Sequence, residues 1–325
     1  MKNLVTGGAG FIGSHLCDHL LAWGDQVHAL DNLSRGRKEH VAHHLDNRLF
    51  RFIEADLLDL EGLLKLFETE RYDAVFHLAA NSDIQRSARE TDLDLRQTFM
   101  TTYNVAECCR RTTVRELLFT SSSTVYGPHE KPLSETTGPL QPISLYGAAK
   151  LAAEAFLTAY ASLYEISLWI FRLPNVVGSR LTHGCVHDFV ERLRKDPTQL
   201  LVLGDGQQRK PYAHVNDVID AMMLAWEHSH DRINCFNIAG DGLTTVREIA
   251  RHVVEEMGLP NVRIEFTGEE RGWPGDVTHF QYDTHKIRQL GWNPRHSPAD
   301  AIRETVRAMI RSSPPGEEPG IKEWS

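Results

Sequence analysis

Tyr146 and Lys150 are the two residues of this chain whose types and spacing most directly suggest chemistry. On a helix, a separation of four residues places the phenol and the ammonium one turn apart on the same face. A free tyrosine has a pKa of about 10, and lowering it by roughly three units requires about 4 kcal/mol of preferential phenolate stabilisation. A lysine one turn away is one source of that stabilisation. The pair therefore indicates a proton-transfer site, although the same spacing also occurs on ordinary amphipathic helices.

A glycine-rich segment near the N-terminus supplies a second functional signal. Residues 2–6 predict a short buried strand, and a helix is expected from Phe11 to about Trp23. Between them, Gly7 would allow a tight turn, Gly10 would let a pyrophosphate approach the backbone, and Gly13 would let the helix pack closely on the strand. The first N–H groups of the helix would face the anion. The predicted dinucleotide contacts of this segment are Gly7, Gly10, Phe11, Ile12 and Gly13.

Asp31 ends the second predicted strand, residues 26–31. A carboxylate at this position accepts hydrogen bonds from the adenosine ribose and repels a 2′-phosphate, which favours NAD over NADP. The nearby Arg35 and Arg37 weaken that preference somewhat, although a solvated basic loop is their simpler interpretation. Asp56 follows the third predicted strand, where its carboxylate can meet the adenine amino group or cap the next helix.

Strand and helix patterns alternate through the first two-thirds of the chain, which predicts an α/β fold with a doubly wound parallel sheet. We expect a Rossmann domain in residues 1–174, and we expect the chain to return to the sheet of this domain near residues 213–240. A smaller α/β substrate-binding lobe is expected mainly in residues 175–311, and a flexible tail in 312–325. Further strands are predicted at 50–54, 74–78, 116–120 and 168–171, and helices at 60–70, 91–111 and 145–164.

Composition narrows the class of protein. The chain has 325 residues, 41% of them hydrophobic, and a net charge of −9. That charge disfavours nonspecific nucleic-acid binding, and no apolar run approaches the roughly 20 residues of a membrane span. We therefore expect a cytoplasmic protein that binds neither nucleic acid nor membrane. The five cysteines lack CxxC spacing, and the pairs His40/His44 and His183/His187 lack a third ligand, so no metal site is predicted.

Residues 119–127 form a predicted strand that runs out into hydroxyl residues, which should face the ligand cleft beyond the sheet. Together with the glycine loop, Asp31, and the Tyr146/Lys150 pair, this order of motifs resembles the extended short-chain dehydrogenase/reductase family. The resemblance covers nearly the whole chain. It is strongest to the nucleotide-sugar epimerases of the UDP-glucose 4-epimerase type, through the segments 31–36, 121–127, 172–175, 204–207, 214–217 and 274–276.

The resemblance implies NAD-dependent epimerisation at C4 of a nucleotide sugar, through a 4-keto intermediate and without net redox. Tyr146 would be the base, Ser122 would hydrogen-bond the same sugar oxygen, and Lys150 would hold the nicotinamide ribose. UDP-glucose and UDP-galactose are the expected substrates. Further cofactor contacts are implied for Asn32, Leu57, Leu78, Ala79 and Ala80, and substrate contacts for Ser122, Ser123, Asn175, Arg209, Lys210, Arg271 and Phe280.

Several positions depart from the family pattern. Ser122, Ser123 and Thr124 stand where the 4,6-dehydratases carry Thr-Asp-Glu, so elimination of water is disfavoured. The decarboxylases usually have glutamate at the position of Thr124, which argues against them more weakly. Lys210 and Trp273 replace family arginines, and Thr98 replaces a frequent asparagine, so the exact nucleotide stays open.

Two other classes also stay open. A dehydrogenase, reductase or decarboxylase could share the fold, and a noncatalytic NAD-binding regulator could keep the glycine loop without the chemistry. The resemblance implies that Phe280 lies near where the family gates the sugar 2-substituent, and its bulky ring then predicts little room for an N-acetyl group, although the ring could be part of the core. A homodimer is implied by the resemblance, formed through the helices at 91–111 and 145–164.

Overall fold

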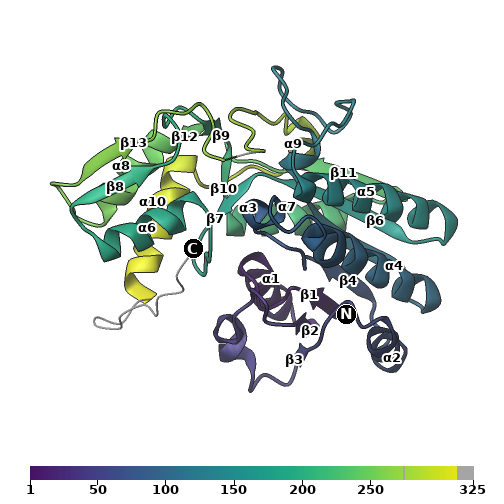
Figure 1. The fold of residues 1–325 in the computed structure, drawn as a ribbon. Helices are drawn as coiled ribbons and strands as arrows, with labels where there is room; N and C mark the ends of the chain where they lie inside the picture. The colour runs from purple at the N-terminus through teal and green to yellow at the C-terminus, as the bar shows by residue number, and fades with distance from the viewer. Residues whose placement is uncertain (274, 313–325) are drawn as a thin grey trace.

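The computed structural model describes residues 1–273 and 275–312 and is built around a seven-stranded parallel sheet (Figure 1). The strand order is β11-β6-β5-β4-β1-β2-β3, so successive crossovers run in opposite directions on the two sides of β1. This confirms the predicted doubly wound α/β fold, and ligands bind such sheets beyond the carboxyl ends of the strands at the reversal point. The strands are β1 (Lys2–Thr6), β2 (Gln26–Asp31), β3 (Phe50–Glu54), β4 (Ala74–His77), β5 (Glu116–Ser122), β6 (Ser167–Leu173) and β11 (Ile233–Asn237).

Helices cover both faces of this sheet and bury it in two separate apolar layers. Leu16 of α1 and Met222 of α7 belong to one buried cluster, while Phe67 of α2, Val105 of α4 and Leu157 of α5 belong to the other. The helix bounds agree with the sequence-based expectations to within one residue for α1, α2 and α5. The helices of the two layers are α1 (Phe11–Ala22), α2 (Leu60–Glu70), α4 (Thr101–Arg111), α5 (Leu145–Leu163) and α7 (Val215–His228).

The helix predicted for residues 91–111 differs from the structure in its first half. Its central turns form a π-helix, η2 (Leu95–Met100), which passes directly into α4. Within η2, the Thr98 hydroxyl accepts a hydrogen bond from the main-chain N–H of Asn81 (3.2 Å) and donates one to Asp94 (3.1 Å). A π-helical turn often marks a functional site, and here it lies beside α5.

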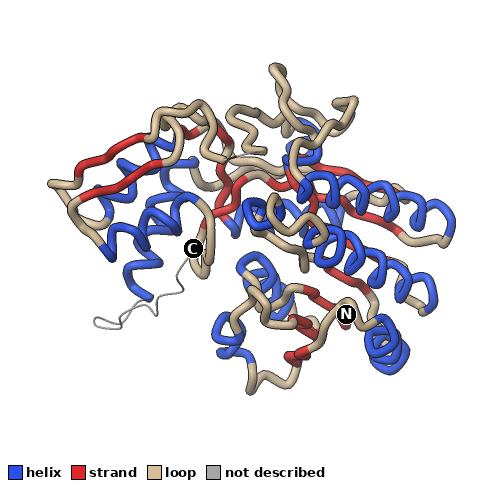
Figure 2. The backbone as a smooth tube through the Cα atoms, in the orientation of Figure 1, coloured by secondary structure: helices blue, strands red, loops and turns tan. Residues whose placement is uncertain are grey.

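A smaller group of elements lies apart from the central sheet, as the backbone trace in Figure 2 shows. It contains the parallel pair β8 (Gln199–Val202) and β13 (Arg263–Phe266), with α6 (Cys185–Lys195), α8 (Val246–Glu256) and α10 (Pro298–Ser312). Their apolar faces share one core. Shorter elements complete the fold: η1 (Lys38–His44), α3 (Ile84–Ser87), η3 (Ser123–Val125), β7 (Asn175–Val177), β9 (Arg209–Lys210), β10 (Tyr212–His214), β12 (Thr244–Thr245) and α9 (His285–Gln289).

The chain returns to the central sheet after this group begins, because β11 pairs in parallel with β6. At the other end of the sequence, Ser312 still belongs to α10, and the rest of the expected tail lies outside the described residues. Within the described residues, we find no helix with the combined length and apolar character of a membrane span.

A buried ion pair connects α5 to β6 and holds the helix that carries Tyr146 and Lys150. Arg172 donates to both carboxylate oxygens of Glu154, at 3.0 and 2.7 Å, and both side chains are almost fully buried. The same guanidinium donates to the Tyr126 hydroxyl at 2.8 Å. Because burial removes the hydration of both charges, each ion depends on its partner, and loss of one leaves the other uncompensated.

Replacing Glu154 with Gln should therefore lower the free energy of unfolding by about 3–5 kcal/mol. The measurement is the urea unfolding of the variant and the wild-type protein. Glu90→Gln is the control, because Glu90 forms an exposed ion pair with Arg86 that contributes much less. Equal losses in the two variants would contradict the assignment of the Glu154–Arg172 pair as a buried structural link.

Candidate active site

The glycine loop lies between β1 and α1 and has little space for side chains. Gly7 has a φ of 70°, and a Cβ added there would lie 2.8 Å from the main-chain nitrogen of Ala79. A Cβ on Gly13 would lie 2.1 Å from the Gly7 carbonyl oxygen, and one on Gly10 would lie 3.0 Å from that same oxygen. The loop thus packs backbone against backbone at the start of α1. This geometry fits a pyrophosphate held by main-chain N–H groups at a helix N-terminus.

Asp31 lies at the carboxyl end of β2, beside the glycine loop. Its two carboxylate oxygens accept hydrogen bonds from the main-chain N–H groups of Ala9 (3.1 Å) and Leu33 (2.9 Å). Burial raises the pKa of Asp31, and these two hydrogen bonds act in the opposite direction. Each oxygen keeps a further lone pair, so the carboxylate can also accept from two ribose hydroxyls. The residues present therefore fit the adenosine end of a dinucleotide.

The remaining expected cofactor residues follow neighbouring strand ends. Asn32 donates to the Asp56 carboxylate at 3.2 Å, and Asp56 also accepts from the main-chain N–H of Leu58 at 2.8 Å. Leu57 is buried, and its carbonyl accepts from the side chain of Asn104 at 2.8 Å. The half-buried Leu78, Ala79 and Ala80 directly follow β4.

Lys150 is the most constrained charged group of the site. Its ammonium donates to the main-chain carbonyl of Thr120 at 2.6 Å and lies 5.9 Å from the centroid of the Tyr146 ring. The residue is only 2% exposed. Burial lowers the pKa of Lys150 to about 7, and the carboxylates of Asp94 and Glu154 oppose that effect. Lys150 is thus held at the end of β5 by its own helix and by a strand carbonyl.

Tyr146 lies in the first turn of α5, which is capped by Ser144: the main-chain N–H of Gly147 donates to its hydroxyl at 3.1 Å. Burial raises the pKa of Tyr146, the negative charge of Asp94 raises it further, and a hydrogen bond with the Ser122 side chain acts in the opposite direction. The lowered pKa expected from the sequence is therefore not a property of the chain alone. In the chain alone, burial and the charge of Asp94 both disfavour the phenolate.

The end of β5 presents hydroxyl groups with unused hydrogen-bonding capacity. Ser122 accepts from the main-chain N–H of Thr124 at 3.3 Å. Among the described residues, the buried hydroxyls of Ser121 and Thr124 have no hydrogen-bond partner. Buried polar atoms are normally paired, so these two groups indicate a place where a polar ligand would complete the site. Ser123 begins the short helix η3 in the same segment.

The residues expected to bind the nucleotide part of the substrate come from several elements. Lys210 forms an ion pair with the buried Asp276, and its ammonium lies 5.0 Å from the Trp273 ring. Asn175 is half-buried on β7. Arg209 and Arg271 are both exposed, whereas Pro274 of the 274–276 segment lies outside the described residues.

Phe280 is 5% exposed and packs in a buried cluster with Val125 and Leu133. It also makes an edge-on contact with the Tyr282 ring, with centroids 5.6 Å apart. This environment matches the core alternative raised in the sequence analysis. A role for Phe280 at the sugar 2-position stays a prediction.

Asp94 is a site residue that the sequence analysis missed. Its Oδ1 accepts from the side chains of Asn81 (3.0 Å) and Thr98 (3.1 Å), while its buried Oδ2 has no partner within the described chain. The charge of Asp94 raises the pKa values of both Tyr146 and Lys150. The spacing of Asp94 and Thr98 at i and i+4 was the available signal, but nothing in one sequence shows that this helix face is buried beside α5.

Replacing Asp94 with Asn should lower the pKa of Lys150 further below about 7, because the ammonium loses a nearby negative charge. The measurement is an NMR titration of the lysine side chains in the cofactor-free protein, with Lys150 assigned by comparison with Lys150→Met. Asp92→Asn is the matched control, since Asp92 is an exposed carboxylate of the same segment. An unchanged Lys150 pKa in Asp94→Asn would refute this influence.

Comparison with known proteins agrees with this geometry. The model of the NAD dependent epimerase/dehydratase family matches residues 3–239. A UDP-glucose 4-epimerase of Mycolicibacterium smegmatis is 36% identical over 96% of this chain and all of its own length. UDP-glucuronic acid decarboxylase 4 of Arabidopsis thaliana is 34% identical over 96% of this chain and 68% of its own length.

A solved structure agrees with the α/β fold and with NAD as the cofactor. The UDP-glucose 4-epimerase of Thermus thermophilus in complex with NAD superposes with a TM-score of 0.86, at 33% identity over 96% of this chain and all of that one. The matched region contains the glycine loop, Asp31 and the Tyr146/Lys150 pair. The chain therefore belongs to the NAD-dependent epimerase/dehydratase family, an extended short-chain dehydrogenase/reductase group, and its cofactor is NAD.

Proposed function

We propose that this protein epimerises a nucleotide sugar at C4, interconverting UDP-glucose and UDP-galactose through a 4-keto intermediate without net redox. The observation that carries the proposal is the Tyr146/Lys150 pair beside a strand end made only of hydroxyl residues. These groups can support reversible oxidation of one carbinol. They provide no carboxylate pair for eliminating water between neighbouring sugar carbons.

The side chains have separable roles in this reaction. NAD, held by the glycine loop and Asp31, would supply a reversible hydride acceptor for C4 of the sugar. Tyr146 removes the proton from the 4-hydroxyl, and Ser122 hydrogen-bonds the same oxygen. Lys150 contributes a positive charge that is fixed by the Thr120 carbonyl, and it would also orient the nicotinamide ribose.

Charge explains why Tyr146 needs the cofactor. Burial and Asp94 both raise the pKa of the phenol in the chain alone. Oxidised nicotinamide carries a positive charge, which would favour the phenolate when it is bound nearby. The base would then be active mainly when the hydride acceptor is present and oxidised, so proton removal and oxidation are coupled.

We assign the nucleotide end of the substrate to the lobe formed mainly by residues 175–311. Asn175 would contact the diphosphate, while Arg209 and Arg271 offer exposed cations to phosphate or ribose. The charge of Lys210 is already compensated by Asp276. Lys210 would therefore act as a hydrogen-bond donor oriented by that carboxylate.

A nucleotide-sugar decarboxylase is the second candidate, because one of the relatives is a UDP-glucuronic acid decarboxylase. A dehydrogenase or reductase would use the same Tyr146/Lys150 pair. Thr124 argues against the decarboxylase, since that branch usually carries glutamate there. A dehydrogenase would consume NAD and a reductase NADH stoichiometrically, and a decarboxylase would release CO2, whereas an epimerase does none of these.

The deciding experiment incubates the purified protein with UDP-, dTDP-, GDP- and ADP-sugars and resolves the products by NMR. UDP-galactose should be converted to UDP-glucose without accumulation of NADH or CO2. UDP-N-acetylglucosamine should react more slowly, as predicted from Phe280. Accumulation of NADH, release of CO2, or no turnover of any sugar would reject the 4-epimerase proposal.

Replacing Tyr146 with Phe should reduce kcat by at least a hundredfold while leaving NAD bound, since only the hydroxyl that transfers the proton is lost. Turnover is followed by NMR, and bound NAD by its release on denaturation. Phe156→Tyr is the matched control, because it changes an exposed ring of the same helix by one hydroxyl. Near wild-type turnover in Tyr146→Phe would exclude this phenol as the base.

We also propose that the protein is a cytoplasmic homodimer assembled through α4 and α5. Several large apolar side chains on α5 and the preceding η2 are exposed, including Leu95, Phe156 and Leu163. Phe156 is 46% exposed and makes an edge-on contact with Phe99, with ring centroids 4.9 Å apart. Exposed apolar side chains on neighbouring helices favour contact with another surface.

Replacing Phe156 with Glu should shift the protein from dimer to monomer, because a dimer interface would bury the new charge. Light scattering after size-exclusion chromatography measures the mass. Leu201→Glu, an exposed apolar position on β8, should leave the mass unchanged. A wild-type monomer, or a Phe156→Glu variant that stays dimeric, would contradict this interface.

A further inference from the structure

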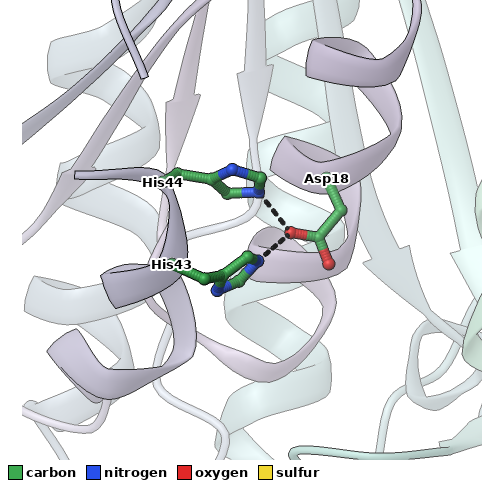
Figure 3. A group of neighbouring side chains, drawn as sticks. All are labelled: Asp18, His43 and His44. Carbon is green, nitrogen blue, oxygen red and sulfur yellow. Dashed lines mark hydrogen bonds and ion pairs between the residues drawn. The ribbon is translucent and has the colours of Figure 1, made fainter. Parts of the chain in front are cut away.

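Asp18, His43 and His44 bring three metal-ligating atoms together outside the catalytic site (Figure 3). Asp18 lies on α1, and the two histidines are consecutive at the end of η1. The Nε2 atoms of His43 and His44 lie 2.9 and 2.7 Å from the same oxygen of Asp18, Oδ1. All three ligand atoms lie within 4.8 Å of one another. This group differs from the histidine pairs His40/His44 and His183/His187, for which the sequence shows no third ligand.

The donor set has a defined chemical preference. Two imidazole nitrogens and one carboxylate oxygen suit Zn²⁺, Co²⁺ and Ni²⁺ better than the hard ions Mg²⁺ and Ca²⁺. Tetrahedral coordination at Zn²⁺ bond lengths places ligand atoms about 3.3 Å apart. The observed nitrogen-to-oxygen distances would have to open by roughly half an ångström, which small side-chain rotations provide.

Arg180 orients the carboxylate within this cluster. Its guanidinium donates to Asp18 Oδ2 at 2.8 Å, on the oxygen that does not face the imidazoles. Ligating carboxylates are commonly held by such a second hydrogen bond, which leaves the other oxygen for the metal. The positive charge of Arg180 also reduces the attraction for a cation, so moderate affinity is expected.

A second group of potential ligands is less suitable. The Nε2 atoms of His214 and His296 lie 3.9 and 3.4 Å from the Glu304 carboxylate. However, His214 Nδ1 accepts a hydrogen bond from the main-chain N–H of Asn216 at 3.3 Å. That bond places the proton of a neutral imidazole on Nε2, the atom facing Glu304, so His214 cannot donate a lone pair there.

The position of the first cluster gives it a structural consequence. The segment leading into η1 is tied to the glycine loop, because the main-chain N–H of Arg37 and Nδ1 of His40 both lie 3.0 Å from the Ala9 carbonyl oxygen. Ala9 in turn donates to Asp31. An ion joining His43 and His44 to Asp18 would therefore fix η1 against α1, next to the residues that contact the adenosine end of NAD.

We propose that Asp18, His43 and His44 form a binding site for a divalent ion of the Zn²⁺ type that links η1 to α1. His43 is the most exposed ligand, with 47% of its side chain accessible, so solvent can complete the coordination. The site does not take part in the epimerisation, and its existence is independent of the proposed substrate.

The test uses the full chain loaded with NAD and titrated with Co²⁺, whose visible absorption reports imidazole and carboxylate coordination. One equivalent of Co²⁺ should give these bands, and one equivalent of Zn²⁺ should remove them. His43→Ala and His44→Ala should each weaken Zn²⁺ binding at least tenfold, as measured by calorimetry. Zn²⁺ should raise the melting temperature of the wild-type protein and not of these two variants.

Two variants provide the controls. His230→Ala removes an exposed histidine outside both clusters, and Glu304→Gln removes the carboxylate of the second cluster. Both should bind Zn²⁺ like the wild-type protein. Circular dichroism checks that every variant is folded, and His43→Ala alters a largely exposed side chain. Absence of Co²⁺ bands, unchanged affinity in both His43→Ala and His44→Ala, or loss confined to Glu304→Gln would each overturn the proposal.

Discussion

The hydrogen bond from the buried Lys150 ammonium to the Thr120 carbonyl is the interaction on which the site depends. It joins α5 to the end of β5 and places a titratable cation 5.9 Å from the Tyr146 ring. Burial makes this position costly for a charge, and lowers the pKa of Lys150 to about 7. Asp94 and Glu154 offset part of that cost. Tyr146 and Lys150 are thus part of a buried network of charged groups that shift each other's pKa values.

The fold supplies the rigid supports of this network. The central strands of the parallel sheet all end at one edge. The glycine loop follows β1 there, Asp31 ends β2, and the hydroxyl residues stand at the end of β5. Arg172 and Glu154 then fix α5 to β6 one turn beyond Lys150. Since the phenol and the ammonium lie on consecutive turns of that helix, their separation is set by the backbone. The site is precise because two strands and one helix hold it.

Sequence reasoning predicted the parts of the fold that follow from local patterns. The strand at 50–54 and the helix at 60–70 were placed with their observed bounds, because strand and helix patterns alternate there, although the helix is capped by Asp59 and not by Asp56. It did not predict the π-helix η2 or the buried position of Asp94, since both depend on how this segment packs on α5. The cluster of Asp18 with His43 and His44 was also missed, because the histidines lie 25 and 26 residues from Asp18 in the sequence. The pKa of Tyr146 could not be predicted from the lysine spacing alone, because burial and the charge of Asp94 both raise it.

We propose that Tyr146 becomes a base only when oxidised NAD adds positive charge to the site. Ultraviolet difference titration of the wild-type protein against Tyr146→Phe measures the ionisation of this single phenol, with and without NAD. We expect a pKa above the ordinary value of about 10 in the cofactor-free protein and well below it with NAD bound. A pKa that is the same in both states, or that stays above 10 with NAD bound, would contradict the account.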